Sequence, residues 1–220
     1  MTTPGLNQLP EDGVVELEFT LVYRGPLPAA SQTSTRTQEK QQIRRLLSSQ
    51  LATLWQQHSN LRSYRDSYLV EATLLPNGSI QYPEGVQGHL PYVRLGGFRL
   101  LPLISRRVQM SCAIAIEFFR RGLPGDIVGH GGDIDNRLKT LLDALRMPQN
   151  INELAGDKPE QPDELFYSVL EDDSLISGLA VDTHQLLIPT TTGERSTDVW
   201  LTIHIETKII RSQVLNMDLQ

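Results

Sequence analysis

Hydrophobic side chains alternate with mostly polar ones in three separate parts of the chain, a pattern typical of β-strands with one buried face. These three segments run over residues 15–23, 108–119 and 199–209. Apolar residues recur at helical spacing in two further segments, over residues 43–55 and 138–145. Strands and helices in this order predict an α+β fold.

The size and composition of the chain limit the class of protein. Its 220 residues are enough to bury a sizeable core, and we expect one enlarged domain over residues 1–220. With 39% hydrophobic and 21% charged residues, the composition is that of a soluble globular protein. No apolar run approaches the roughly 20 residues of a membrane-spanning helix, so no membrane is expected as a partner. The first thirty residues lack a basic start followed by an apolar core, and we expect a cytoplasmic protein without a secretory signal.

The strand predicted at residues 108–119 contains the one cysteine, Cys112. A single cysteine excludes an internal disulfide and a zinc site with several cysteines, so we expect Cys112 to be a small buried residue. Ala113 and Ala115 fall on the opposite face of the same strand. Their small apolar side chains predict that this face is also at least partly covered.

Charge is unevenly distributed along the chain. The net charge of −6 argues weakly against nucleic-acid binding, because polyanions usually select basic surfaces. Between residues 91 and 146, however, nine basic residues face five acidic ones, whereas from residue 147 onward thirteen acidic residues accompany four basic ones. The middle of the chain is therefore the part best suited to contact a polyanion.

Polar residues on the two predicted helices indicate which faces meet solvent. On the helix at 43–55, Arg44 and Arg45 lie outside the apolar stripe and are expected to face solvent or a ligand. On the helix at 138–145, the face opposite the leucines is polar and carries Asn136, Lys139, Thr140 and Asp143. Since Lys139 and Asp143 are one helical turn apart, we expect an ion pair between them.

Carboxylates gather at two points of the chain. Asp133 and Asp135 stand at the entrance of the second helix, and the triplet Glu171, Asp172 and Asp173 follows a short apolar strand at residues 166–170. Capping of the helix would explain one aspartate there but not the second, nor the later pair. Oxygen donors alone are the ligands that magnesium or manganese prefers over zinc or copper, so Asp133, Asp135, Asp172 and Asp173 are candidate metal ligands.

A calcium-binding EF-hand is the alternative interpretation of the first cluster. A loop of this type that starts at Asp133 requires glycine at its sixth position and glutamate at its twelfth. The chain has Leu138 and Ala144 at these positions. The EF-hand is therefore rejected.

The acidic residues form a longer pattern with their neighbours. It consists of Asp133-Ile-Asp135-Asn136, then Lys139, then Asp143-Ala-Leu145, and finally Glu171-Asp172-Asp173-Ser-Leu-Ile. This pattern resembles that of the RusA family of Holliday junction resolvases, over about half of the chain. The resemblance implies a single mixed β-sheet with flanking helices, with a core at about residues 13–58 and 108–210. The segment at about 59–107 would then be a large insertion before the central strand.

The resemblance also implies roles for individual residues. The metal-binding carboxylates would be Asp133, Asp135 and Asp173, with Asp172 as the alternative to Asp173, and Lys139 would be the essential lysine. Asn136 matches the pattern, although orienting an aspartate or capping the helix explains it equally well. Arg120, Arg121, Arg137 and Lys139 are the candidate DNA contacts, whereas ordinary solvated arginines would be the simpler explanation of the first three.

The implied function is a Mg²⁺- or Mn²⁺-dependent endonuclease that hydrolyses phosphodiesters in branched DNA such as Holliday junctions, during DNA recombination or repair. A junction is nearly two-fold symmetric, so a homodimer is expected, with the early strand or the helix around Leu47 as candidate interfaces. Unlike the short, basic members of this family, the chain is acidic and carries the insertion. Two alternatives therefore stay open: a catalytically inactive module that binds nucleic acid or protein, and a metal-dependent nuclease with RNA or a nucleotide as substrate.

Overall fold

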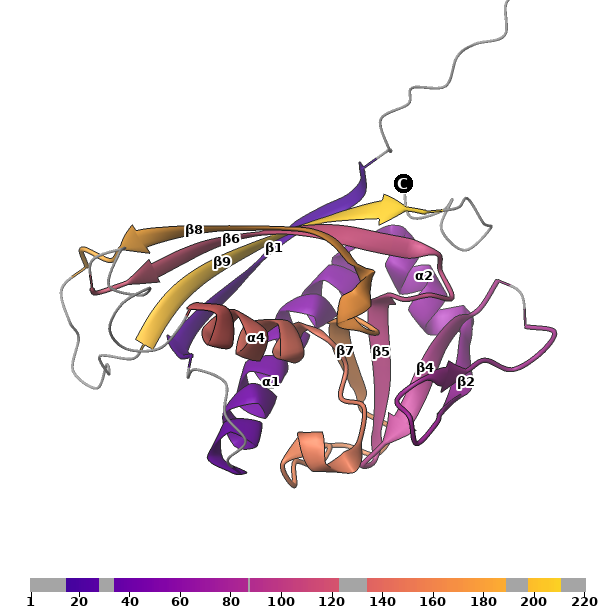
Figure 1. The fold of residues 1–220 in the computed structure, drawn as a ribbon. Coiled ribbons are helices and arrows are strands. Elements are labelled where there is room, and N and C mark those ends of the chain that lie inside the picture. Colours follow the sequence, from indigo (N-terminus) through magenta and orange to yellow (C-terminus); the bar gives the residue numbers. More distant parts are fainter. Residues whose placement is uncertain (1–14, 28–33, 87, 123–133, 189–197, 211–220) are drawn as a thin grey trace, which may run out of the picture.

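The computed structural model describes residues 15–27, 34–86, 88–122, 134–188 and 198–210. Within these residues the chain forms two mixed β-sheets, three α-helices and two short 3₁₀ helices (Figure 1). The helices are α1 (Ser34–Gln57), α2 (Ser59–Ser67) and α4 (Ile134–Leu145), and the 3₁₀ helices are η1 (Ile151–Leu154) and η2 (Asp173–Leu175). No described helix is both long and apolar enough to cross a membrane.

The first sheet, called sheet A below, contains the three strands predicted from alternation and one further strand. Its order is β1-β9-β6-β8. The strands are β1 (Val15–Pro26), β6 (Met110–Arg120), β8 (Ile176–Gln185) and β9 (Asp198–Ile209). β9 is antiparallel to both β1 and β6, and β6 is parallel to β8. β8 is therefore an edge strand.

The second sheet, sheet B, has the order β3-β2-β4-β5-β7. Its strands are β2 (Leu69–Leu74), β3 (Ile80–Gln81), β4 (Leu90–Leu95), β5 (Phe98–Ile104) and β7 (Leu165–Leu170). A turn at residues 76–79 joins β2 to β3, and Gly96 and Gly97, both with positive φ, join β4 to β5. Residues 59–107, taken from the resemblance as an insertion, thus supply α2 and four strands of sheet B.

The expected α+β class is confirmed, but the chain forms two sheets where a single one was predicted. Residues 69–104 supply four strands of a second sheet, and the remaining strand of that sheet is β7. This strand runs parallel to β5, from Arg99 opposite Leu165 to Ile104 opposite Leu170, and so belongs to sheet B and not to the sheet of β6. Pairing between strands this far apart in the sequence leaves no signal in the local pattern of either strand.

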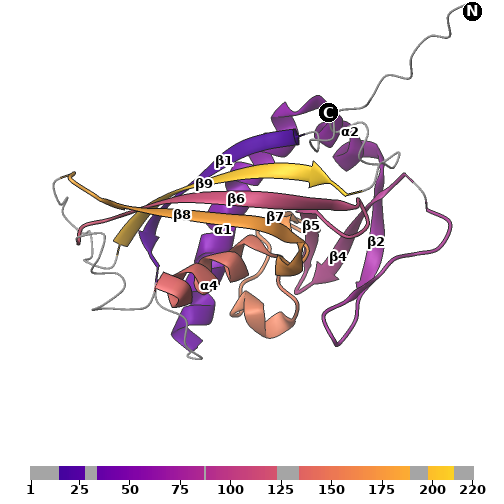
Figure 2. The same cartoon turned by 45° about the horizontal axis from the view of Figure 1, so that its top comes forward.

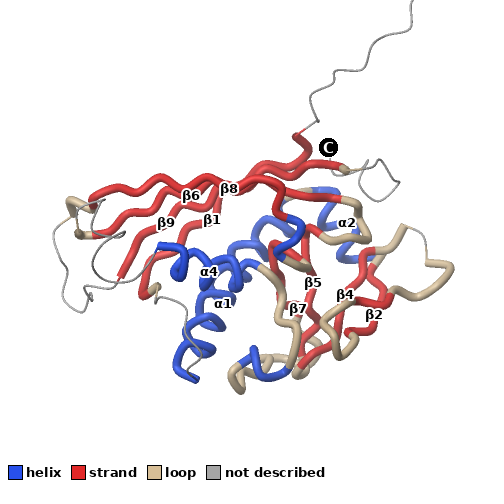
Figure 3. The backbone as a smooth tube through the Cα atoms, viewed as in Figure 1, coloured by secondary structure: helices blue, strands red, loops and turns tan. Residues whose placement is uncertain are grey.

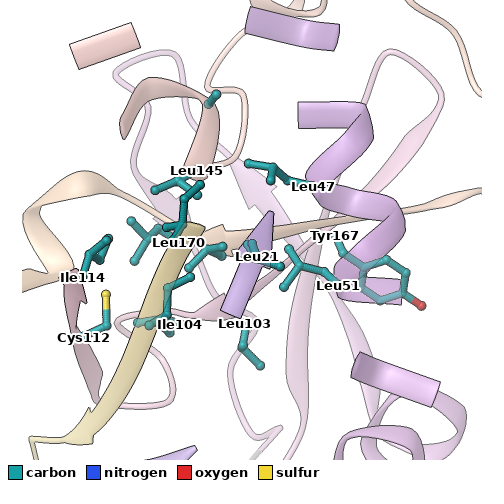
Figure 4. Close-up of a cluster of buried hydrophobic side chains, with 14 of the residues drawn as sticks. Leu21, Leu47, Leu51, Leu103, Ile104, Cys112, Ile114, Leu145, Tyr167 and Leu170 are labelled. Atoms are coloured by element: carbon teal, nitrogen blue, oxygen red, sulfur yellow. The ribbon is translucent and has the colours of Figure 1, made fainter. Parts of the chain in front are cut away.

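Helix α1 lies between the two sheets and organises the core (Figures 1 and 2). Figure 4 shows Leu47 and Leu51 of α1 near Leu21 of β1 and Tyr167 of β7. Leu47 is only 2% exposed, so this face of α1 is part of the core and not the dimer interface that the sequence indicated.

The described helices lie on one face of sheet A (Figure 3). On β6, Met110, Cys112, Ile114, Ile116 and Phe118 are buried toward the helices, as predicted. The opposite face was expected to be partly covered, but Ala115 is exposed there and Ala113 is half-buried. Among the described residues, only neighbouring strands of the sheet flank these alanines, so small side chains here do not reflect a second layer.

Candidate active site

Helix α4 directs two of the predicted catalytic residues to the surface. Leu141 and Leu145 are buried, and Leu138 and Leu142 pack against the same core. Asp135 and Lys139 are exposed and lie one turn apart, on the same face of the helix. Within the described part of the chain, Lys139 has no hydrogen bond or ion pair, so its ammonium group is available to a ligand.

The predicted ion pair between Lys139 and Asp143 does not form. Asp143 instead accepts a hydrogen bond from Lys40 of α1, with 3.2 Å between Nζ and Oδ2. The prediction was wrong because Asp143 is half-buried and its side chain contacts α1. The ammonium group of Lys40 on that helix lies closer to Asp143 than that of Lys139 does. Thr140, also expected on the polar face, is buried and donates to the Asn136 carbonyl of the preceding turn.

Arg44 fixes α4 against α1 from within the protein. Its side chain is fully buried, although the sequence indicated a solvent-facing residue. Nη2 donates to Glu153 Oε2 at 2.7 Å and to the Asp143 carbonyl at 2.8 Å. Arg146 contacts Glu153 as well, at 3.2 Å. Burial lowers the pKa of Arg44, and the charge of Glu153 opposes this shift. The last turn of α4 is thus held by a buried ionic network.

The two aspartates after β7 have different environments. Asp172 caps η2: its Oδ1 accepts from the Ser174 amide at 3.1 Å, from the Ser174 hydroxyl and from Arg106 at 3.3 Å. Its Oδ2 accepts from Gln149 at 3.1 Å. Burial acts to raise the pKa of Asp172, but the Ser174 hydrogen bonds and the charge of Arg106 outweigh it, and the pKa lies below its ordinary value.

Asp173, in contrast, is exposed, and its carboxylate has no hydrogen bond or ion pair to any described residue. Both oxygens of Asp172 already have partners within the protein. Of the two aspartates between which the sequence left the choice open, Asp173 is therefore the one with oxygens available to a ligand.

Glu171 is a buried carboxylate that the sequence did not single out as functional. It is 6% exposed, and its Oε2 accepts from the Tyr82 hydroxyl at 2.8 Å and from the Arg106 amide at 2.9 Å. Burial raises the pKa of Tyr82, and the charge of Glu171 raises it further. Tyr82 belongs to the segment at 59–107 that the resemblance implies to be an insertion. This segment therefore bonds to Glu171, the first residue of the acidic triplet. No pattern in the sequence pairs residues so far apart.

Replacing Tyr82 with Phe is expected to lower the free energy of unfolding by about 1–2 kcal/mol, because the buried Glu171 carboxylate loses one of its two donors. Urea unfolding followed by circular dichroism measures this loss. Tyr92 offers the matched control, since its hydroxyl also donates to a glutamate, Glu71, but at the exposed surface. Tyr92→Phe should cost less than about 0.5 kcal/mol, and equal costs for both variants would contradict the structural role of Glu171.

The predicted DNA-contacting arginines lie at the end of β6 and in the first turns of α4. Arg137 is half-buried and donates to the Leu27 carbonyl, and Arg121 donates to the Ile188 carbonyl at 2.7 Å. Burial and, secondarily, the nearby positive charge of Arg120 lower the pKa of Arg137. Arg137 is thus bonded within the protein, and the positive charge of Arg120 lies near it.

The residues around α4 and η2 meet the chemical requirements of a Mg²⁺ site only in part. Asp135 and Asp173 supply exposed carboxylate oxygens, the donors that this ion prefers. α4 packs against η2, which brings the two elements together. The described residues contain no group of three or more His, Cys, Asp or Glu side chains placed to hold a metal ion. The third expected ligand, Asp133, lies outside the described residues.

A separate cavity of about 750 Å³ lies between α1 and the segment after η1. It is lined by Gln38, Gln41, Gln42, Arg45, Leu46, Leu154, Ala155, Gly156 and Asp157. Arg45 and Asp157 form an ion pair at 2.8 Å within this wall, and Gln41 donates to the same aspartate. Of the described residues, none of the predicted metal ligands or DNA contacts lines this cavity, so we place the candidate active site at α4 and η2.

Comparison of the chain with models of known protein families, with curated proteins and with solved structures gave no match.

Proposed function

We propose that the protein is a divalent-metal-dependent endonuclease of the RusA type that hydrolyses phosphodiesters in branched DNA. One observation carries the proposal: α4 exposes Asp135 and Lys139 on one face and packs against η2, where Asp173 is exposed without a polar partner among the described residues. Exposed carboxylates beside an unpaired lysine suit a ligand that combines a hard cation with an anionic phosphate.

The protein's own residues would act on the phosphodiester as follows. Asp135 and Asp173, with Asp133, would hold Mg²⁺ or Mn²⁺, which supplies an activated water and neutralises charge on the phosphate. The Lys139 ammonium would donate hydrogen bonds to a phosphate oxygen or to the leaving oxygen as negative charge develops. Arg120 and Arg137 would bind neighbouring phosphates through charge-assisted hydrogen bonds.

Contacts within the protein would maintain the positions of these groups. Asp172 caps η2 and binds Arg106, while Glu171 fixes the backbone amide of Arg106. The Arg44 network holds the other end of α4. A metal site requires its ligands to be held rigidly, and these contacts would provide that rigidity.

Cleavage of defined DNA structures tests the proposal. Labelled four-way junctions, flaps and plain duplex are incubated with the protein in Mg²⁺ and in Mn²⁺, beside labelled single-stranded and duplex RNA. We expect cleavage of branched DNA that is lost in Asp135→Asn and retained in Asp66→Asn, a control at an exposed aspartate of α2.

Each alternative gives a different result in the same assay. Cleavage of RNA in place of DNA would keep the metal chemistry and replace the substrate. Metal-independent binding of junctions without any cleavage would indicate the inactive binding module. An Asp135→Asn variant that cuts as fast as the wild type would reject the proposed site.

A further inference from the structure

Sheet A has two edge strands among the described residues, β1 and β8. Gln50 of α1 bonds to both backbone groups of Val22 at the outer edge of β1, whereas the outer edge of β8 has no described strand beside it. β8 pairs with β6 along one side, and no described strand pairs with its other side. Leu179 is 46% exposed on this strand, and Leu187, just beyond its end, is 80% exposed. Soluble proteins usually protect edge strands with charges, prolines or bulges, because free backbone groups invite pairing with another chain. Apart from Asp182 and an irregularity near its start, the ten-residue strand β8 has none of these protections and contains no proline.

The hydrogen bonds of β8 define which backbone groups face outward. The Leu186 amide donates to the Arg120 carbonyl of β6 at 2.6 Å. Backbone groups alternate in direction along a strand, so residues 180, 182 and 184 also face β6. Residues 179, 181, 183, 185 and 187 therefore present their amides and carbonyls to the open edge.

We propose that β8 pairs with β8 of a second copy of this chain, antiparallel, with the two-fold axis at Thr183. In this register the outward-facing residues form the hydrogen-bonded pairs, and Leu179 lies opposite Leu187 of the second copy. Asp182 lies opposite His184 of the second copy in a non-hydrogen-bonded pair, in which side chains come closest. The register thus pairs exposed leucine with leucine and carboxylate with imidazole, twice each because of the symmetry.

Neighbouring registers lack this complementarity. A two-fold axis at Val181 would place Asp182 opposite Ala180 and would leave Leu187 opposite Leu175, which is buried in its own subunit. His184 stacks on Phe119 of β6 at 4.9 Å, and its Nε2 bonds to Glu117 of the same strand, so Asp182 of the second copy would approach the other nitrogen, Nδ1, of this imidazole. The pairing would join two four-stranded sheets into one continuous sheet.

This interface does not depend on nuclease activity, since it follows from the edge strand alone. It would nevertheless give a junction-cutting enzyme its two related active sites.

Engineered cysteines test the register directly. Thr183→Cys should form a disulfide-linked dimer under mild oxidation, because the symmetry-related Cα atoms would lie about 5.5 Å apart, within disulfide range. Val181→Cys is the matched control on the same edge and should form about tenfold less disulfide-linked dimer. The cysteine at position 181 of the second copy would lie several residues away along the strand. The native Cys112 is buried and does not compete.

Sedimentation of the full chain provides the second measurement. The wild type should be a dimer, and Thr183→Pro should be a monomer with unchanged circular dichroism, because the lost amide faces away from β6. A monomeric wild type, or equal cross-linking of the two cysteine variants, would overturn the proposal. Both measurements are independent of DNA cleavage, so they cannot fail merely because the proposed function is wrong.

Discussion

Asp173→Asn is expected to lower the rate of DNA cleavage in saturating Mg²⁺ by about 10²–10³-fold, because charge stabilisation at the reacting phosphate is lost. Asp173 is exposed and has no described polar partner, so the substitution should leave the stability of the fold nearly unchanged. Single-turnover cleavage of a labelled junction measures the rate, and thermal unfolding confirms that the variant is folded.

Asp172→Asn is the matched comparison at the adjacent position. Its carboxylate caps η2 and contacts Arg106 and Gln149, so we expect a loss of about 1–2 kcal/mol in the free energy of unfolding. Cleavage at a temperature where this variant is folded should stay within about tenfold of the wild type, since its contacts only position the turn. The reverse result, an inactive Asp172→Asn beside an active Asp173→Asn, would assign the metal ligand to Asp172.

Arg44→Ala is expected to destabilise the protein by about 3–5 kcal/mol, the cost of breaking a buried ionic network by removing one member. The truncation leaves Glu153 with Arg146 as its remaining cation and leaves the Asp143 carbonyl without its guanidinium donor. It also creates a cavity between α1 and α4, where the side chain is fully buried. Urea unfolding at neutral pH gives the free-energy difference.

Arg62→Ala provides the control for this measurement. Arg62 lies exposed on α2, and the one hydrogen bond of its guanidinium to a described residue is that to the Gln56 carbonyl at 3.5 Å, so its removal should cost less than about 0.5 kcal/mol. If Arg44→Ala lowers the free energy of unfolding by less than about 1 kcal/mol, the buried network contributes little to stability and the prediction is wrong.

The elements that could be predicted are those in which apolar residues repeat at a regular spacing along the chain. The strands β1, β6 and β9 and the helices α1 and α4 follow from alternation or helical periodicity, because each buries one face against a single core. β8 was not predicted, because it does not bury one face in this way. As an edge strand it is exposed or half-buried along its whole length, so its sequence shows no clean alternation.

Pairings over long distances in the chain could not be predicted from the sequence. Arg44 was expected at the surface and Asp143 beside Lys139, whereas Arg44 is buried against Glu153 and Asp143 meets Lys40. A charged residue on a helix has the same local pattern whether it meets water or a buried partner, because the partner comes from another element. The second sheet and the contact of Tyr82 with Glu171 were not predicted either, because in both the partner comes from another element of the chain.

The sequence by itself determined the order of the main elements and the chemistry of the candidate site, since both reside in residue types and their spacing along the chain. Only the tertiary structure decided which carboxylate is available to a ligand. Asp172 and Asp173 are adjacent and chemically identical, yet Ser174, Gln149 and Arg106 surround the first and leave the second exposed. That difference arises because Gln149 and Arg106 reach this turn only once the chain has folded.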